Sequence, residues 1–157
     1  MTTHSQTHAT FVLERDYPVP VDRVWAAFAD PELKRKWFGS DDFIYTDRTD
    51  DFRVGGTTTD DGYDGEGGPF SQFHATYTDI KPHERIVYTY DMWLNGAHAS
   101  TSITTIVFTP TPTGTHLTFT EQGVHLDNVH GPDAASGRES GTATLLETLA
   151  KVLTPTP

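Results

Sequence analysis

The chain has 157 residues, a length typical of one domain, and it carries 22 acidic against 11 basic side chains for a formal net charge of −11. This excess of negative charge argues against nonspecific binding to nucleic acids or anionic membranes. The absence of cysteine excludes disulfides, thiolate metal sites and a cysteine nucleophile. Residues 1–9 are polar and lack the apolar core of a secretory signal. We therefore expect a cytoplasmic protein with a flexible tail over residues 1–9.

A strand and two short helices are the first predicted elements. Alternation of side chains predicts a strand over 10–17. Apolar residues at three- and four-residue spacing predict a helix over 21–30. Asp30 can cap a second short helix over 31–38, and Gly39 is a typical stop signal after it.

The middle of the chain is predicted to consist almost entirely of strands and turns. Its segments are rich in Thr, Tyr, Phe, Val and Ile, which is typical of half-buried strands. The pair Asn95-Gly96 tolerates positive φ and indicates a two-residue antiparallel hairpin. The predicted strands cover residues 42–47, 51–58, 69–80, 85–94, 97–109 and 115–123.

A long helix is predicted over 132–153, with Pro132 in its first turn and Pro155 after its end. Its predicted apolar stripe contains Gly141, Leu145, Leu149 and Val152 or Leu153, and is broadened by Leu146. The order of elements predicts a single α+β domain over 10–153, followed by a tail over 154–157. In this fold a curved antiparallel sheet of six to seven strands wraps the long C-terminal helix and encloses an apolar cavity.

Five motifs follow one another along nearly the whole chain: YPVPVDRVW at 17–25, DPEL with KWF within 30–38, FRVGG at 52–56, PHERIVY at 82–88 and GTHLTF at 114–119. Together they resemble the helix-grip (SRPBCC) superfamily of START domains, birch-pollen allergens and polyketide cyclases. The most similar branch is that of bacterial homologues of the C-terminal domain of the heat-shock-protein-90 ATPase activator. The resemblance implies a helix-grip fold with an apolar pocket, but its members include binding proteins, cyclases, hydrolases and co-chaperones.

One departure from the family pattern lies in the last helix. The family usually carries Gly-Trp there, whereas this chain has Gly141-Thr142. Loss of the indole removes a large apolar wall, so the cavity, the packing at its mouth or an interface is expected to differ.

Aromatic residues are the main candidates for a cavity lining, although each of them could equally be part of a packed core. Gly137 and Gly141 indicate either close approach of the sheet or a ligand to the helix, or simple tight packing. The expected lining comprises Trp37, Phe38, Phe43, Phe52, Phe73, Tyr88, Tyr90, Trp93 and Phe119, with Gly141, Leu145 and Leu149 from the helix.

Acid–base chemistry has three candidate residues, of which Glu121 is the most interesting. Glu121 shares the strand face of Phe119, and a carboxyl group in an apolar cavity has a raised pKa and can act as a general acid or base. The alternative interpretation is an edge-strand charge or a partner for Arg138. His74 and Tyr90 are further candidates that could face inward.

The sequence predicts no metal site and no cofactor. The acidic segment 60–68 fails the EF-hand pattern and is interpreted as a mobile hairpin loop that could form a flap beside a cavity mouth. Metal-ligand spacing is absent among the histidines of the second half, His74, His98, His116, His125 and His130.

Three functions are consistent with these observations. The leading one is a non-catalytic domain that binds a small apolar or aromatic molecule. The alternatives are a co-chaperone-like domain that binds another protein, and an enzyme of the cyclase, dehydratase or hydrolase kind that uses Glu121, His74 and Tyr90. We expect no nucleic-acid or membrane partner, and either a monomer or a homodimer.

Overall fold

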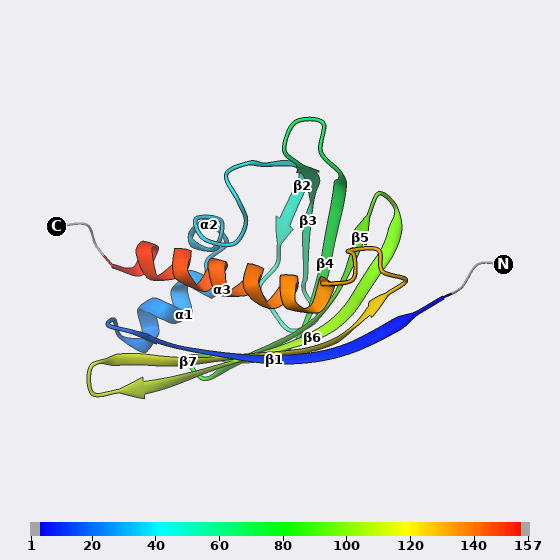
Figure 1. Ribbon diagram of the computed structural model, residues 1–157. Helices are drawn as coiled ribbons and strands as arrows, with labels where there is room; N and C mark the ends of the chain where they lie inside the picture. The colour runs from blue at the N-terminus through cyan, green and yellow to red at the C-terminus, as the bar shows by residue number, and fades with distance from the viewer. Residues whose placement is uncertain (1–3, 155–157) are drawn as a thin grey trace.

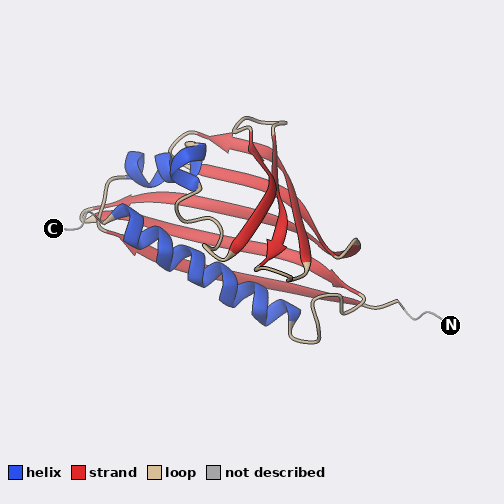
Figure 2. Ribbon diagram, turned by 90° about the horizontal axis from the view of Figure 1, so that it is seen from above, coloured by secondary structure: helices blue, strands red, loops and turns tan. Residues whose placement is uncertain are grey.

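The computed structural model describes residues 4–154 and contains a seven-stranded antiparallel sheet with helices on its concave side (Figures 1 and 2). The strands are β1 (Gln6–Tyr17), β2 (Phe43–Asp50), β3 (Thr57–Asp64), β4 (Phe70–Lys81), β5 (Arg85–Leu94), β6 (Ala97–Thr111) and β7 (Gly114–Leu126). The helices are α1 (Val21–Ala29), α2 (Pro31–Lys34) and α3 (Ala134–Leu153). The strand order β1-β7-β6-β5-β4-β3-β2 and the long final helix confirm the predicted α+β helix-grip fold.

Local signals set several of the boundaries as the sequence predicted. The Asp30 side chain accepts a hydrogen bond of 2.9 Å from the main-chain N–H of Glu32 and caps α2. Asn95 and Gly96 have φ angles of 49° and 83° and form the turn between β5 and β6. Within residues 4–154 the structure contains no helix of the length and apolar character that a membrane crossing requires.

Strand β1 begins earlier than the sequence indicated. Residues 6–9, predicted as part of a tail, pair with β7 from Gln6 opposite Leu126 onward. Just before the strand, the main-chain N–H of Ser5 donates to the Asp127 carboxylate at 2.8 Å. Strand pairing and this hydrogen bond therefore order the segment, although its side chains are mostly polar and supply little apolar surface for packing. The rest of the predicted tails falls mainly on residues 1–3 and 155–157, which lie outside the described residues.

The predicted strand over 51–58 is wrong for most of its length. Residues 51–56 form a turn in which Gly55 has a φ of 83° and its N–H donates to the Tyr77 carbonyl at 2.8 Å. Positive φ at Gly55 is incompatible with a continuous strand. The strand follows the turn, over Thr57–Asp64.

As a consequence, Asp60 and Asp61 lie in β3, not in the mobile loop predicted over 60–68. Their carboxylates are paired with neighbouring strands: Asp60 with Arg48 at 3.1 Å and Asp61 with His74 at 2.9 Å. Cross-strand partners therefore allow two consecutive acidic residues inside a strand.

Three irregularities in pairing bend the sheet. The register shifts within β2 after Tyr45, within β4 after Tyr77 and between β5 and β6 at Trp93. An extra residue in one strand increases its bend and twist. In Figure 1, β2, β3 and β4 rise steeply away from the direction of β1 and β7, so the sheet forms a wall beside α3 as well as a floor beneath it.

Helix α3 packs on the floor of the sheet through Thr142, Leu146, Leu149 and Leu153, which are its buried residues. The hydroxyl of Tyr17 on β1 donates to the main-chain carbonyl of Leu146 at 3.0 Å and fixes the helix to the sheet. The predicted stripe is therefore rotated slightly: Gly141 and Leu145 lie at the edge of the packed face. They face the space between α3 and the rising strands instead.

Candidate functional site

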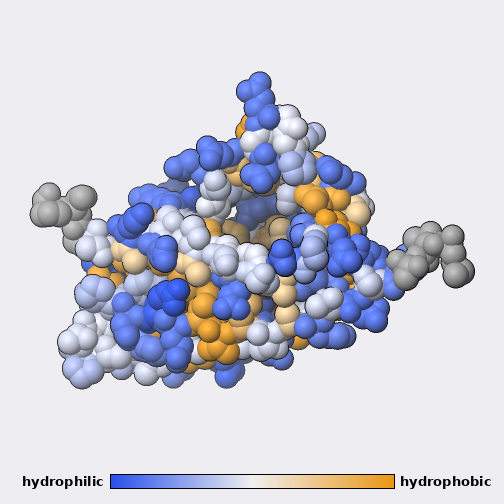
Figure 3. All heavy atoms as spheres, in the orientation of Figure 1, coloured by the Kyte–Doolittle hydropathy of each residue, from blue (hydrophilic) through white to orange (hydrophobic). Residues whose placement is uncertain are grey.

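A cavity of about 770 Å³ lies between α3, the short helices and the rising part of the sheet. Figure 3 shows the molecule hollowed above α3, so the cavity is open to solvent on this side. Helix α3 contributes Ala134, Gly137, Arg138, Gly141 and Leu145 to its wall. A volume of this size is typical of pockets for small organic ligands, which span roughly 300–1,000 Å³.

Aromatic rings form a continuous part of the wall. Phe38 contacts Phe73 with ring centroids 5.6 Å apart, and Phe73 contacts Tyr90 at 4.7 Å. Trp37 and Phe28 extend this row toward α1 with centroids at 4.7 Å. The Trp37 indole N–H donates to the Ala27 carbonyl at 2.8 Å, which fixes the ring. Such a wall offers flat apolar surface and ring edges to a ligand.

Most residues proposed from sequence as a cavity lining come together here. Trp93 and Leu149 do not. Trp93 lies on the outer face of the sheet and stacks on His98, with ring centroids 5.3 Å apart, because alternation along β5 turns Tyr88, Tyr90 and Met92 inward. Leu149 is fully buried in the core beneath α3. The residues that do line the cavity are Trp37, Phe38, Phe43, Phe52, Phe73, Tyr88, Tyr90, Phe119, Gly141 and Leu145.

The two helix glycines border empty space. A methyl group built on Gly137 or Gly141 would meet no atom within 4 Å, although both residues line the cavity. Tight packing of the sheet against these glycines, one of the two interpretations from sequence, is therefore wrong. Their small size recesses the helix surface and enlarges the cavity.

A polar cluster lies on the cavity wall where α3 faces β5 and β7. The Arg138 guanidinium donates to the Tyr90 hydroxyl at 2.8 Å and to the Ser100 hydroxyl at 2.9 Å. Glu121 lies 3.7 Å from Arg138 and accepts a hydrogen bond of 3.2 Å from Thr104. Glu121 is thus near Arg138, as one interpretation of the sequence proposed, but β7 is an interior strand and not an edge.

Burial governs the protonation of this cluster. Desolvation raises the pKa of Glu121, and contacts with Tyr90, Arg138 and Thr104 lower it only in part. Burial also raises the pKa of Tyr90, which keeps the phenol neutral, against an opposing effect of Arg138. The cluster can therefore donate and accept hydrogen bonds within an otherwise largely aromatic wall.

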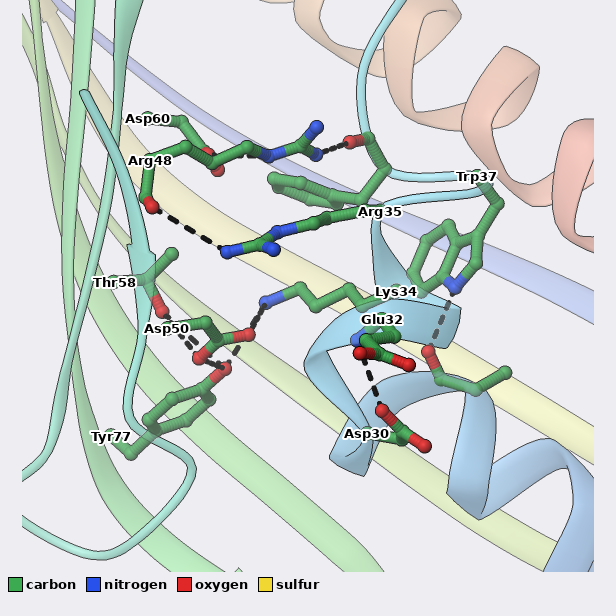
Figure 4. Close-up of polar contacts among 12 residues, drawn as sticks. Asp30, Glu32, Lys34, Arg35, Trp37, Arg48, Asp50, Thr58, Asp60 and Tyr77 are labelled. Carbon is green, nitrogen blue, oxygen red and sulfur yellow. Dashed lines mark hydrogen bonds and ion pairs between the residues drawn. The ribbon is translucent and has the colours of Figure 1, made fainter. Parts of the chain in front are cut away.

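A second polar cluster surrounds Lys34 at the end of the cavity near α2 (Figure 4). The ammonium of Lys34 lies 3.3 Å from the Asp50 carboxylate and donates to the Tyr77 hydroxyl at 3.1 Å. Tyr77 in turn donates to Asp50 at 2.9 Å, and Thr58 donates to the same carboxylate oxygen at 3.1 Å. Burial alone would lower the pKa of Lys34, but Tyr77 and Asp50 outweigh it and raise the pKa. Lys34, Asp50 and Tyr77 thus supply one another's hydrogen-bond and ion-pair partners.

Beside this cluster, Asp60 pairs with Arg48 at 3.1 Å, as Figure 4 also shows. Desolvation raises the pKa of Asp60 to about 6, against the opposing effects of Arg48 and Lys34. Asp60 lines the cavity, so part of its wall gains or loses charge at mildly acidic pH.

The three acid–base candidates are separated by the sheet. Glu121 and Tyr90 lie together in the cavity wall. His74 lies on the opposite face, where it pairs with Asp61 and its ring contacts Trp93 at 5.0 Å. The prediction that His74 faces inward is therefore wrong, because its neighbour Phe73 takes the inward position on β4.

Within residues 4–154, no three histidine or acidic side chains come close enough to hold a metal ion. His130 lines the cavity, while the buried Nδ1 of His125 has no hydrogen-bond partner among the described residues. Burial and the nearby Arg138 lower the pKa of both histidines.

Sequence reasoning missed several residues of this site, notably Lys34, Tyr77, Met92, His130 and, as a cavity residue, Arg138. For Arg138 a signal existed: it lies three residues before Gly141, which places both on one side of a helix. For Lys34 there was none, since its position depends on contacts with strands distant in sequence.

Comparison with known proteins agrees with this architecture. The model of the family described as Activator of Hsp90 ATPase homolog 1-like protein matches residues 18–154. A putative uncharacterized protein from Rhizobium leguminosarum is 39% identical, with a TM-score of 0.89 over 97% of this chain and 98% of that one. A Rhizobium loti protein is 43% identical, with a TM-score of 0.85 over 94% and 99%. No match was found among curated proteins.

More distant relatives share the fold alone. An AHSA1-like protein from Aeromonas hydrophila is 20% identical and gives a TM-score of 0.68 over 92% of each chain.

Proposed function

Because the chain belongs to the family of Activator of Hsp90 ATPase homolog 1-like proteins, whose fold here surrounds an open cavity, we propose that it binds a small apolar or aromatic molecule there. The observation that carries this proposal is the size of the cavity together with its aromatic wall. The space of about 770 Å³ is bordered by Trp37, Phe73 and Tyr90, and it continues to the recessed surface at Gly141.

Burial of apolar surface supplies the driving force for such binding. Each square ångström of apolar surface removed from water contributes roughly 25 cal/mol. The rings are held by contacts with each other and by the Trp37 hydrogen bond, so little ordering of the wall is required on binding.

A fluorescent apolar probe tests the proposal. N-phenyl-1-naphthylamine is uncharged and brightens in apolar surroundings, so its titration into the protein should give saturable binding. Gly141→Leu places a side chain in the cavity and should weaken binding strongly. Ser140→Leu, on the exposed side of the same helix, is the matched control and should leave binding unchanged. Absence of saturable binding, or equal loss in both variants, would contradict a ligand site in the cavity.

Protein binding of the co-chaperone kind is a second candidate, and the open outer face of the sheet favours it. Val12, Ile103 and Val107 expose their side chains there, around Thr105 and Thr120 in the strand register. Stimulation of the ATPase activity of a bacterial Hsp90 by the wild type, and its loss in a Val12→Asp/Ile103→Asp variant, would support this function. No stimulation by the wild type would remove it.

A further inference from the structure

We propose that the molecule bound in the cavity carries a carboxylate group, and that this group binds the guanidinium of Arg138. The inference rests on the proposed function, because it names the chemical class of ligand for the same cavity. It follows from a comparison of the partners of Arg138 and Lys34, the two buried cations of the cavity wall, and from the recessed surface of α3 beside Arg138.

The charge of Arg138 is only partly compensated by the protein. Its side chain is 13% exposed, and its two hydrogen bonds go to the neutral hydroxyls of Tyr90 and Ser100. The nearest carboxylate, that of Glu121, lies 3.7 Å away, beyond hydrogen-bond distance. A buried guanidinium usually makes short, often paired hydrogen bonds to an anionic oxygen. Arg138 lacks this kind of partner among the described residues.

Lys34 shows the opposite arrangement. Its ammonium lies 3.3 Å from Asp50, and the Tyr77 hydroxyl bridges the two groups with hydrogen bonds of 3.1 and 2.9 Å. This closed network leaves no unmatched charge. Of the two cations, Arg138 is therefore the one with capacity to bind an anion.

The position of Arg138 on α3 favours an anion beside it, although the Glu121 carboxylate 3.7 Å away opposes one. Arg138 lies near the start of α3, which begins at Ala134, and the N-terminal end of a helix carries partial positive charge. Burial lowers the pKa of His125 and His130, and the positive charge of the Arg138 guanidinium lowers it further. Asp133 also lines the cavity but is exposed, so water screens its repulsion.

The helix surface gives a ligand access to Arg138. Gly137 precedes it and Gly141 lies three residues after it, and a methyl group on either glycine would meet no atom within 4 Å apart from its chain neighbours and its own helix backbone. The Arg138 side chain therefore stands beside a recess in which a flat group can lie against the helix. Beside it lies the Tyr90 ring, whose centroid is 5.5 Å from the guanidinium carbon, and the Phe73 ring continues this wall at a centroid distance of 4.7 Å from Tyr90. A carboxylate at Arg138 thus places an attached aromatic body next to this wall.

Paired probes of equal shape test the inference. 2-Naphthoate carries a carboxylate and 2-naphthamide a neutral amide on the same ring system. Isothermal titration calorimetry at pH 7 should show 2-naphthoate binding at least about tenfold more tightly, since a hydrogen bond to a charged group contributes roughly 1.5–3 kcal/mol. Arg138→Met should abolish this preference. Lys151→Met, which removes the exposed cation of the same helix, should keep it.

A second variant acts in the opposite direction. Glu121→Gln removes the carboxylate that repels an anion at Arg138, so it should tighten 2-naphthoate and leave 2-naphthamide unchanged. If Arg138→Met does not fold because it leaves Glu121 unpaired, the double variant Arg138→Met/Glu121→Gln removes the whole pair and should also show no preference.

N-phenyl-1-naphthylamine separates failure of the inference from failure of the proposed function. If this neutral probe binds but 2-naphthoate is no tighter than 2-naphthamide, the cavity binds apolar molecules without a carboxylate, and the inference is overturned. If none of the three probes binds, the inference and the proposed function both fall.

Discussion

The carboxylate of Glu121 and the guanidinium of Arg138 approach each other to 3.7 Å without a direct hydrogen bond, although their side chains are only 6% and 13% exposed. Two buried opposite charges at this distance remain partly unsatisfied. Desolvation accordingly raises the pKa of Glu121 above its ordinary value.

The first prediction concerns how stability depends on pH. The folded state binds the Glu121 proton more tightly than the unfolded state does, so stability rises as the pH falls through the raised pKa toward 4.5. Relative to Glu121→Gln, the wild type should therefore gain free energy of unfolding as the pH is lowered from 8 to about 5. Urea unfolding at several pH values measures this difference. Glu147→Gln, on the exposed side of α3, controls for the loss of one negative charge. A constant difference between wild type and Glu121→Gln would contradict the prediction.

The second prediction concerns Lys34 and Asp50, which are 12% and 9% exposed. Lys34→Met leaves the Asp50 carboxylate buried without its cation and should lower the free energy of unfolding by roughly 3–5 kcal/mol. Lys34→Met/Asp50→Asn removes both charges and should be more stable than Lys34→Met alone. Denaturant unfolding of the complete mutant cycle measures the coupling. Strictly additive losses would show that the two groups do not stabilise each other.

The third prediction uses the empty space beside α3. Gly137→Ala and Gly141→Ala should each raise the free energy of unfolding by about 0.5–1 kcal/mol, because alanine favours a helix and its methyl group meets no neighbour. Gly62→Ala is the contrasting variant: its methyl group would collide with the Ile44 carbonyl, so it should destabilise the protein. Thermal and urea unfolding of the three variants measures these changes. If Gly137→Ala and Gly141→Ala were destabilising, the surroundings of α3 would differ from those described.

The fourth prediction concerns Thr142, which lines the cavity and is 8% exposed. Thr142→Trp introduces the indole that the family usually carries at this position, and the ring would extend into the cavity. We expect at least a roughly tenfold loss of affinity for N-phenyl-1-naphthylamine, equivalent to about 1.4 kcal/mol. Ser140→Trp on the exposed side of α3 is the control. Undiminished binding in Thr142→Trp would place the probe elsewhere on the protein.

The sequence was sufficient for the order of elements and for features set by near neighbours. The Asp30 cap and the Asn95-Gly96 turn depend only on residues next to them in the chain, and both were predicted correctly. Tyr90 and Trp93 are three residues apart on β5, and alternation of side chains along a strand places them on opposite faces of the sheet. The sequence therefore already argued against Trp93 as a cavity residue.

Features that depend on distant partners could not be predicted in this way. Asp60 and Asp61 were predicted to lie in a loop, because their partners Arg48 and His74 are distant in sequence and the acidic pair alone is unfavourable in a strand. The depth of the cavity likewise depends on register shifts in β2 and β4 that leave no clear pattern in composition. Local propensity describes single elements, whereas these features arise from pairing between them.

Helix α3 has one side held by Leu146, Leu149 and Leu153 and another, at Gly137, Gly141 and Leu145, that borders the cavity. Thr142 and Leu146 belong to both sides, but Leu149 and Leu153 lie only in the core and Gly137 and Gly141 only at the cavity. Mutations at the two glycines can therefore change what fits inside while Leu149 and Leu153 keep the scaffold intact. Such a division allows single substitutions to change the shape of the cavity without loss of the fold. It gives a physical basis for evolutionary diversification without redesign of the fold.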